Sequence, residues 1–145
     1  MRIVVFVHNG QAFDPVPDET HRRDIDLRSA APRTGSFAIV GWKRAGEKAA
    51  AMAARYGDRV DRLVLCATPI PTDEKFELKT ITAKTLLLFG AADPDAPSKA
   101  ARWWKNQISG ARVEMVPRAG SEIITTFWKR VLSHSAPGSG RTSRN

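Results

Sequence analysis

The chain has 145 residues, of which 42% are hydrophobic and 26% are charged. This length and balance suit a single globular domain and exclude a disordered chain. The 23 lysines and arginines outnumber the 15 acidic residues, which gives a formal charge of +8. Because the basic residues fall in separate segments, the charge favours anionic ligands in general but argues against a nucleic-acid-binding face.

The apolar runs predict six strands along the chain. Four continuous runs are typical of strands in a parallel sheet that is covered on both faces. A fifth run, which alternates mildly, predicts a strand nearer an edge, and a further short segment could form an extra edge strand. In chain order the predicted strands are residues 3–7, 24–27 (the short edge strand), 37–40, 63–67, 85–89 and 112–116.

Three helices are predicted between and after these strands, over residues 45–56, 98–108 and 121–133. Serines suited to N-capping begin the second and third, and glycines follow the first and second. The alternation predicts an α/β fold: a mostly parallel sheet of five to six strands flanked by about three helices. We expect a single domain over residues 1–135 and a disordered, basic, Ser/Gly-rich tail over residues 136–145.

The single cysteine, Cys66, excludes an intramolecular disulfide and a metal cluster with thiolate spacing. The amino-terminal stretch MRIVVFVHNG has too short an apolar run for a signal peptide or a membrane span. No phosphate-binding glycine-rich loop is present in the sequence. We therefore expect a cytoplasmic protein that has no membrane association, no metal and no other cofactor.

Several stretches occur in the order found in a known superfamily. Gly41-Trp42-Lys43-Arg44-Ala45 occupies a strand-to-helix turn, and YGDRVDRLVL follows the next helix. Three further stretches belong to the same pattern: VHNG near the amino terminus, then LLLFGAADP and ARVEMVPRAG in the second half of the chain. Together they resemble the α/β-hydrolase superfamily, and the chain is identified as a truncated, cap-less member. The resemblance implies the nucleophile elbow, the acid-bearing turn, the strand before the histidine turn and the oxyanion turn of that family.

The resemblance also implies a degenerate catalytic triad. The nucleophile position is Lys43, the acid position is Asp93 and the histidine position is Ser121. Hydrolysis in this family needs a hydroxyl nucleophile and an imidazole that takes and returns its proton. Both are missing, so serine-histidine-aspartate hydrolysis is not expected and the chain resembles a pseudoenzyme.

Three roles remain open for Lys43. Its side chain could be solvated, could form an ion pair with Asp93 in the vacated triad space, or could act as a base or Schiff-base nucleophile. Of these, the ion pair is our specific expectation. Cys66 is expected to be an inert core residue rather than a nucleophile.

The leading functional hypothesis is binding of a small, anionic molecule in a reduced pocket at the carboxyl ends of the strands. The candidate catalytic residues are Asp93, Lys43 and His8, and the candidate substrate-binding residues are Asn9, Gly10, Trp42 and Ser121. An alternative is a non-hydrolytic enzyme, such as a cyclase, lyase or isomerase of a biosynthetic pathway, with Asp93 or Asp14 as acid or base.

A third possibility is a dimeric scaffold or interaction protein. The resemblance implies missing elements and few covering helices, which would expose apolar surface on the sheet. The neighbouring Trp103 and Trp104 cannot both enter one core from adjacent helical positions, and tryptophan is enriched at interfaces. We therefore expect a homodimer.

Overall fold

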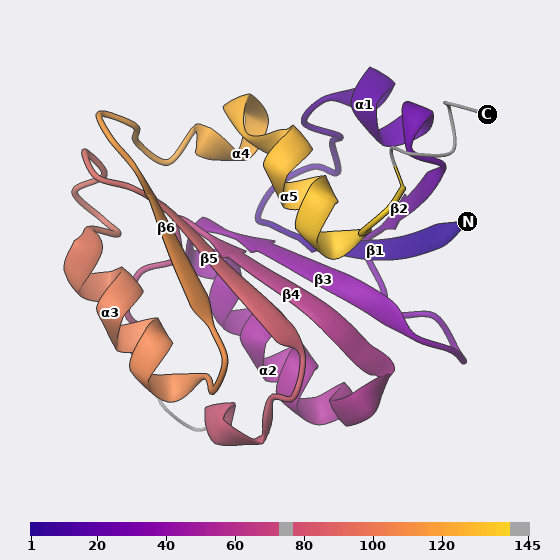
Figure 1. Ribbon diagram of the computed structural model, residues 1–145, viewed down its shortest axis with the longest axis horizontal. Coiled ribbons are helices and arrows are strands. Elements are labelled where there is room, and N and C mark those ends of the chain that lie inside the picture. Colours follow the sequence, from indigo (N-terminus) through magenta and orange to yellow (C-terminus); the bar gives the residue numbers. More distant parts are fainter. Residues whose placement is uncertain (73–76, 140–145) are drawn as a thin grey trace.

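Six parallel strands form one sheet in the computed structural model, which describes residues 1–72 and 77–139. Their order across the sheet is β2-β1-β3-β4-β5-β6 (Figure 1). The strands are β1 (Arg2–Val7), β2 (Ile25–Arg28), β3 (Phe37–Trp42), β4 (Val60–Cys66), β5 (Lys84–Gly90) and β6 (Arg112–Val116). The order changes direction between β1 and β3, and in open parallel sheets ligands bind beyond the carboxyl ends of the strands at such a point.

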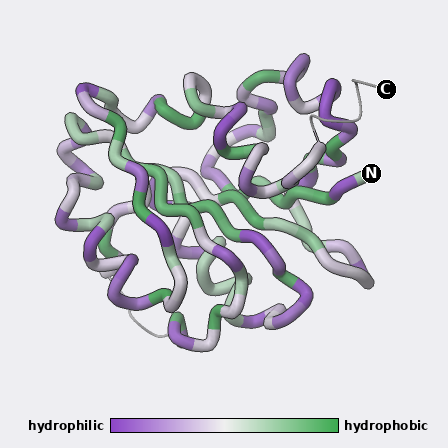
Figure 2. The backbone as a smooth tube through the Cα atoms, viewed as in Figure 1, coloured by the Kyte–Doolittle hydropathy of each residue, from purple (hydrophilic) through white to green (hydrophobic). Residues whose placement is uncertain are grey.

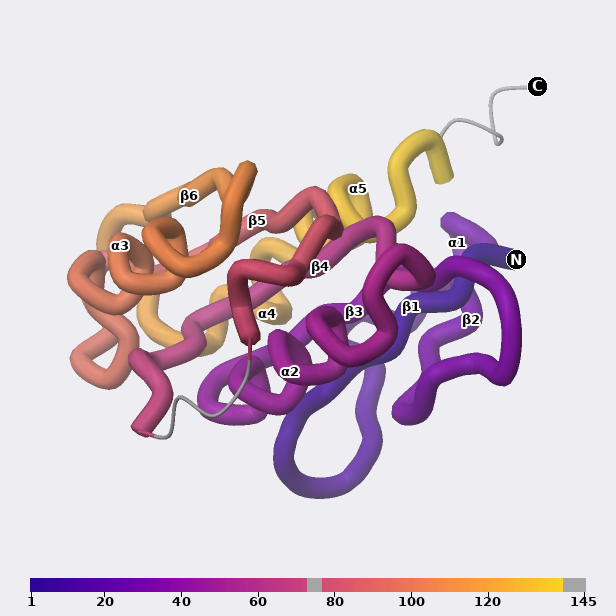
Figure 3. The backbone as a smooth tube through the Cα atoms, turned by 90° about the horizontal axis from the view of Figure 1, so that it is seen from below, coloured from indigo at the N-terminus to yellow at the C-terminus, as the bar shows by residue number. Residues whose placement is uncertain are grey.

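Five α-helices lie in the described part of the chain. They are α1 (Pro17–Arg22), α2 (Gly46–Tyr56), α3 (Ser98–Gln107), α4 (Ile123–Thr126) and α5 (Trp128–Ser135). Helices α2 and α3 cover one face of the sheet, and α1, α4 and α5 lie on the other (Figures 1 and 3). The sequence-based prediction of a mostly parallel α/β sheet is confirmed.

The strand side chains divide into two cores because successive residues of a strand point to opposite faces. Ile39 and Leu63 pack beneath α2 and α3, whereas their neighbours Val40 and Val64 pack beneath α4 and α5. The central strands are green along most of their length in Figure 2, whereas purple dominates many of the turns. This two-sided burial explains why the central runs are continuously apolar in the sequence.

The predicted helix count of about three is too low, for two reasons. The last predicted helix, residues 121–133, is interrupted at Phe127, whose φ of −113° and ψ of 22° separate α4 from α5. Helix α1 lies in a segment without helical periodicity and is held by side-chain hydrogen bonds instead. The Oδ1 atom of Asp14 accepts the Val16 N–H (3.1 Å) and the Thr20 hydroxyl (2.8 Å) at its start.

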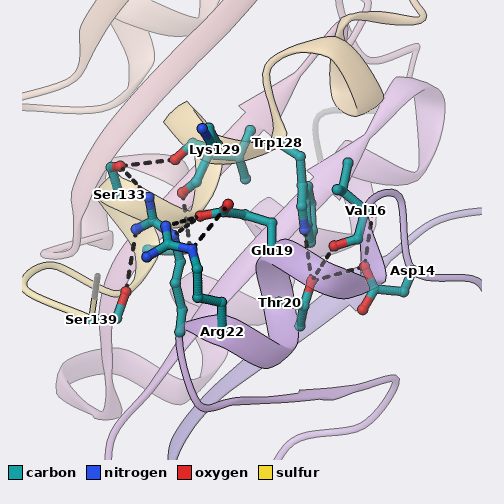
Figure 4. Close-up of polar contacts among 12 residues, drawn as sticks. Asp14, Val16, Glu19, Thr20, Arg22, Trp128, Lys129, Ser133 and Ser139 are labelled. Carbon is teal, nitrogen blue, oxygen red and sulfur yellow. Dashed lines mark hydrogen bonds and ion pairs between the residues drawn. The ribbon is translucent and has the colours of Figure 1, made fainter. Parts of the chain in front are cut away.

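Polar contacts tie α1 to α5 and to the chain that follows it (Figure 4). The buried carboxylate of Glu19 accepts hydrogen bonds from Arg22 (2.6 Å) and Arg23 (2.5 Å). These guanidinium groups hold the pKa of Glu19 below its ordinary value, although burial acts in the opposite direction. Arg23 also donates to the hydroxyls of Ser133 and Ser139, so one buried carboxylate organises both segments.

In the described part of the protein, neither face of the sheet exposes a large apolar surface to solvent. There, the only large hydrophobic side chains that are clearly exposed are Met1 and Phe13. Trp104 is fully buried and its Nε1 donates to the Thr68 carbonyl (3.0 Å), while Trp103 is half-buried beside it. The homodimer was expected because apolar surface would be exposed on the sheet, and the described residues do not expose such a surface. The homodimer therefore stays a prediction.

The packed part of the chain extends past the expected boundary at residue 135. Ala136 is buried in the core beneath α4 and α5. Residues 140–145 of the predicted tail lie outside the described residues. None of the described helices has the length and apolar character needed to cross a membrane.

Candidate functional site

Lys43 stands at the apex of a sharp turn between β3 and α2. Its φ of 58° lies in the left-handed region, which costs a non-glycine residue about 1–2 kcal/mol. A Cβ on Gly41 would lie 2.6 Å from the Ala49 Cβ and 2.7 Å from the Gly46 Cα, so strand and helix are in direct contact. The turn thus has the strain and the close packing that the resemblance implies for a nucleophile elbow, with Lys43 at its apex.

A cavity of about 390 Å³ opens above this turn, at the carboxyl ends of the strands. We call it the carboxyl-end cavity. Loops that follow five of the strands supply its lining: Asn9, Lys43, Arg44, Ala67, Pro69, Asp93, Asp95 and Ser121. The three positions that the resemblance assigns to a triad, Lys43, Asp93 and Ser121, therefore lie around one cavity.

Asp93 is the buried acidic group of this site, with 3% of its surface exposed. Its Oδ1 atom accepts the backbone N–H of Asp95 at 3.0 Å. Its Oδ2 atom is buried and has no hydrogen-bond partner among the described residues. Such an unsatisfied acceptor costs about 1–3 kcal/mol, more when it is charged, and a partner supplied by a ligand would recover that energy.

Lys43 does not form the expected ion pair with Asp93, so that prediction is wrong. Its side chain is exposed, and its Nζ atom lies 4.3 Å from the ring centroid of Trp42. The Trp42 ring is fixed in turn, because its Nε1 donates to the Ser121 carbonyl at 2.8 Å. Over the indole the ammonium stays hydrated, whereas reaching a buried carboxylate would require its desolvation.

The positive charge of Lys43 acts on Glu122, a fully solvated residue. The N–H groups of Glu122 itself and of Gly120 lower the pKa of the Glu122 carboxyl, and the positive charge of Lys43 adds to the effect. Two cations, Lys43 and Arg44, line the carboxyl-end cavity, and the Arg44 guanidinium forms an ion pair of 3.3 Å with the Glu47 carboxylate.

The predicted oxyanion turn is divided between two cavities. Asn9 lines the carboxyl-end cavity, whereas His8 lines a neighbouring cavity of about 440 Å³ together with Asp14. The His8 ring packs against the rings of Phe6 and Phe13, with centroids 4.6 and 4.9 Å away. The Asp14 carboxylate accepts hydrogen bonds at the start of α1, as described above. His8 and Asp14 therefore do not share the carboxyl-end cavity with Asp93.

Gly10 and Trp42 line neither of these two cavities. Gly10 is exposed and its φ of 92° serves the turn after β1. Trp42 contacts two residues that line the carboxyl-end cavity, through its hydrogen bond to the Ser121 carbonyl and through its ring beneath the Lys43 ammonium. Both residues therefore shape the loops of the site rather than its surface.

Cys66 is fully buried at the end of β4. Burial raises the pKa of its thiol strongly, and the negative charge of Asp93 raises it further. Because the thiolate is the nucleophilic form, Cys66 is inert in the folded protein, as the sequence led us to expect.

Sequence reasoning did not assign Arg44, Ala67, Pro69 or Asp95 to the site. Asp95 could have been found, because it follows Asp93 and Pro94 in the acid-bearing turn. Ala67 has a φ of 54°, a second strained residue at the rim of the cavity that no sequence pattern marks. Among the described residues, no group of three His, Cys, Asp or Glu side chains is arranged to hold a metal ion.

Comparison with known proteins supports the fold and shows nothing finer. No protein-family model and no curated protein matches the chain. A solved serine hydrolase involved in carbazole degradation is similar in structure, with a TM-score of 0.71 and 13% identity over 92% of this chain and 90% of that one. A CIB-like hydrolase from Thermoplasma acidophilum has a TM-score of 0.66 and 19% identity, over 90% and 82% of the two chains. A carboxylesterase from Bacillus subtilis has a TM-score of 0.63 and 12% identity, over 94% and 84%.

Proposed function

We propose that this chain, which has the α/β-hydrolase fold, binds a small molecule in the carboxyl-end cavity and does not carry out serine-histidine-aspartate hydrolysis. One observation carries the proposal: Asp93 lines the cavity, and its buried Oδ2 atom has no partner among the described residues. A buried carboxylate oxygen that accepts no hydrogen bond is rare in folded proteins. A bound ligand with a hydrogen-bond donor would satisfy this oxygen.

The arrangement around Asp93 supports the second half of the proposal. In triad hydrolysis an imidazole between the acid and the nucleophile transfers the proton. Here Ser121 occupies the histidine position, and none of the described residues that line the cavity is a histidine. The elbow lysine points onto Trp42, away from the acid that would have to orient a base.

The same geometry indicates the chemistry of the ligand. Oδ2 of Asp93 accepts hydrogen bonds, so the ligand presents a hydroxyl or ammonium group to it. Lys43 and Arg44 at the mouth favour an acidic group at the other end of the ligand. A volume of about 390 Å³ suits a small metabolite, since ligand pockets commonly span 300–1,000 Å³. The proposed ligand is thus a hydroxy acid, an amino acid or a close relative.

Calorimetric titration with a panel of hydroxy acids and amino acids tests the binding. In Asp93→Asn, the amide oxygen can still accept the hydrogen bond of the Asp95 N–H. The amide NH₂ group takes the place of Oδ2, so it would face the donor group of the ligand and could not accept its hydrogen bond. Losing one charged hydrogen bond of about 1.5–3 kcal/mol weakens binding by about tenfold to hundredfold. Asp18→Asn, an exposed change of the same charge on α1, should leave the affinity unchanged.

The absence of triad hydrolysis needs its own assay. We expect no covalent adduct with a fluorophosphonate probe and no ester turnover above that of Ser121→Ala. Labelling of Ser121, or ester turnover that disappears in Ser121→Ala, would contradict the proposal even if a ligand binds.

A further inference from the structure

Another cavity lies at the opposite end of the sheet, where β4, β5 and β6 begin. It measures about 530 Å³, and we call it the amino-end cavity. Five basic side chains line it: Arg62, Lys84, Arg112, Arg130 and His134. None of its described lining residues is an aspartate or glutamate.

The strand register brings these residues together, although they are far apart in the sequence. Arg62 of β4 is the direct partner of Lys84 of β5, and two residues further along β5 Leu86 is the partner of Arg112 of β6. Residues two apart on a strand share a face, and Val64 and Leu86 pack in the core beneath α5. Arg62 and Lys84 therefore lie side by side on the face that α5 covers.

Helix α5 supplies the other side of this cavity. Arg130 and His134 are four residues apart, so they lie on the same side of the helix. The His134 Nε2 atom donates to the Lys84 carbonyl at 2.9 Å, which fixes the ring against the start of β5. Three strands and one helix thus supply the lining of this cavity.

The positive charge is only partly neutralised. Glu114 accepts hydrogen bonds from Arg130, the shortest of 2.5 Å, and lies 3.5 Å from Arg112. Arg62 and Lys84 have no carboxylate partner among the described residues, although like charges side by side on a sheet destabilise it. One carboxylate serves two arginines, while two further cations remain unpaired at the same place.

We propose that the amino-end cavity binds a small anion that carries phosphate groups. Guanidinium groups match phosphate oxygens in pairs, and a lysine adds a point charge. A concave cavity of this size suits a small molecule, whereas nucleic-acid binders present an extended basic face. This site is separate from the carboxyl-end cavity, so either proposal can fail without the other.

His134 provides a probe inside the cavity. Burial lowers the pKa of its imidazole, the hydrogen bond to the Lys84 carbonyl acts against this, and the positive charges of Arg62, Arg130 and Arg112 lower it further. A bound anion offsets those charges, so it should raise the pKa of His134 towards 6.5.

Calorimetric titration with inorganic pyrophosphate at fixed ionic strength tests the proposal. Arg62→Gln/Lys84→Gln should weaken binding by about tenfold or more, since each removes a charge-assisted contact. Lys48→Gln/Lys99→Gln is the matched control, because it removes the same charge from exposed positions on α2 and α3. This control should change the affinity by less than about twofold.

Two results would overturn the proposal. One is that pyrophosphate does not bind, whether or not a single-stranded DNA oligonucleotide does, and the other is equal weakening in both double variants. An NMR titration of His134 in the unsubstituted protein gives an answer that does not depend on the variants folding. A rise in its pKa with pyrophosphate supports the site, and an unchanged value counts against it.

Discussion

Replacing Lys43 with glycine and with alanine tests the left-handed turn at the end of β3. Both variants lose the contact with the Trp42 ring, so their difference isolates the backbone. At a φ of 58°, alanine carries a strain of about 1–2 kcal/mol that glycine avoids. Glycine loses about 0.4–1 kcal/mol more through the entropy of the unfolded chain. The glycine variant should therefore be more stable by roughly 0.8 kcal/mol, the midpoint of a range of about 0–1.6 kcal/mol.

Lys48, an exposed residue of α2, offers the opposite case. In a regular helix alanine is more stable than glycine by about 1 kcal/mol, so the order of the two variants should reverse. Urea unfolding of all four variants, with equal m-values, measures both differences. If alanine is more stable than glycine at position 43 by as much as it is at position 48, the turn is not left-handed and the assignment of Lys43 to an elbow fails.

Three further predictions address packing, pH dependence and thiol reactivity. Gly41→Ala should destabilise the protein by about 1–3 kcal/mol in urea unfolding, because its Cβ would overlap Ala49 and Gly46; an unchanged midpoint would contradict the close contact. The lowered pKa values of Glu19 and Glu114 stabilise the fold above the ordinary value of 4.5, and this stability should be lost as the pH falls through their folded values below 4.5. Urea midpoints measured down this range should depend less on pH in Glu19→Gln and Glu114→Gln. Cys66 should react with a thiol reagent only as fast as the protein unfolds, and rapid labelling of the native protein would show that it is not buried.

Much of the sheet follows from the sequence because buried parallel strands need continuous apolar runs. The bounds of β6 agree with the predicted ones, and the other strands differ by a few residues at their ends. Helix α1 escaped prediction for a physical reason: six residues cannot show a helical period, and the contacts of Asp14 and Thr20 that hold it come from folding. The Trp128 Nε1 atom, which donates to the Thr20 hydroxyl at 2.8 Å, comes from the far end of the chain.

The site was predictable as a set of positions but not as a set of contacts. The motif order placed Lys43, Asp93 and Ser121 correctly around one cavity. The direction of the Lys43 side chain depends on the strained backbone and on the Trp42 ring, and sequence spacing reports neither. The amino-end cavity was missed in another way: Arg62, Lys84 and Arg112 are dispersed in the sequence, and only the strand register gathers them.

The central claim is that the carboxyl-end cavity holds a ligand and leaves it intact. The most direct test is to incubate the native protein with a metabolite extract, separate it by ultrafiltration, and identify the retained molecules by mass spectrometry. We predict that the protein retains an unaltered acidic molecule with a hydroxyl or amino group, and that Asp93→Asn does not. Equal retention by the two proteins, or the appearance of hydrolysis products, would contradict the account.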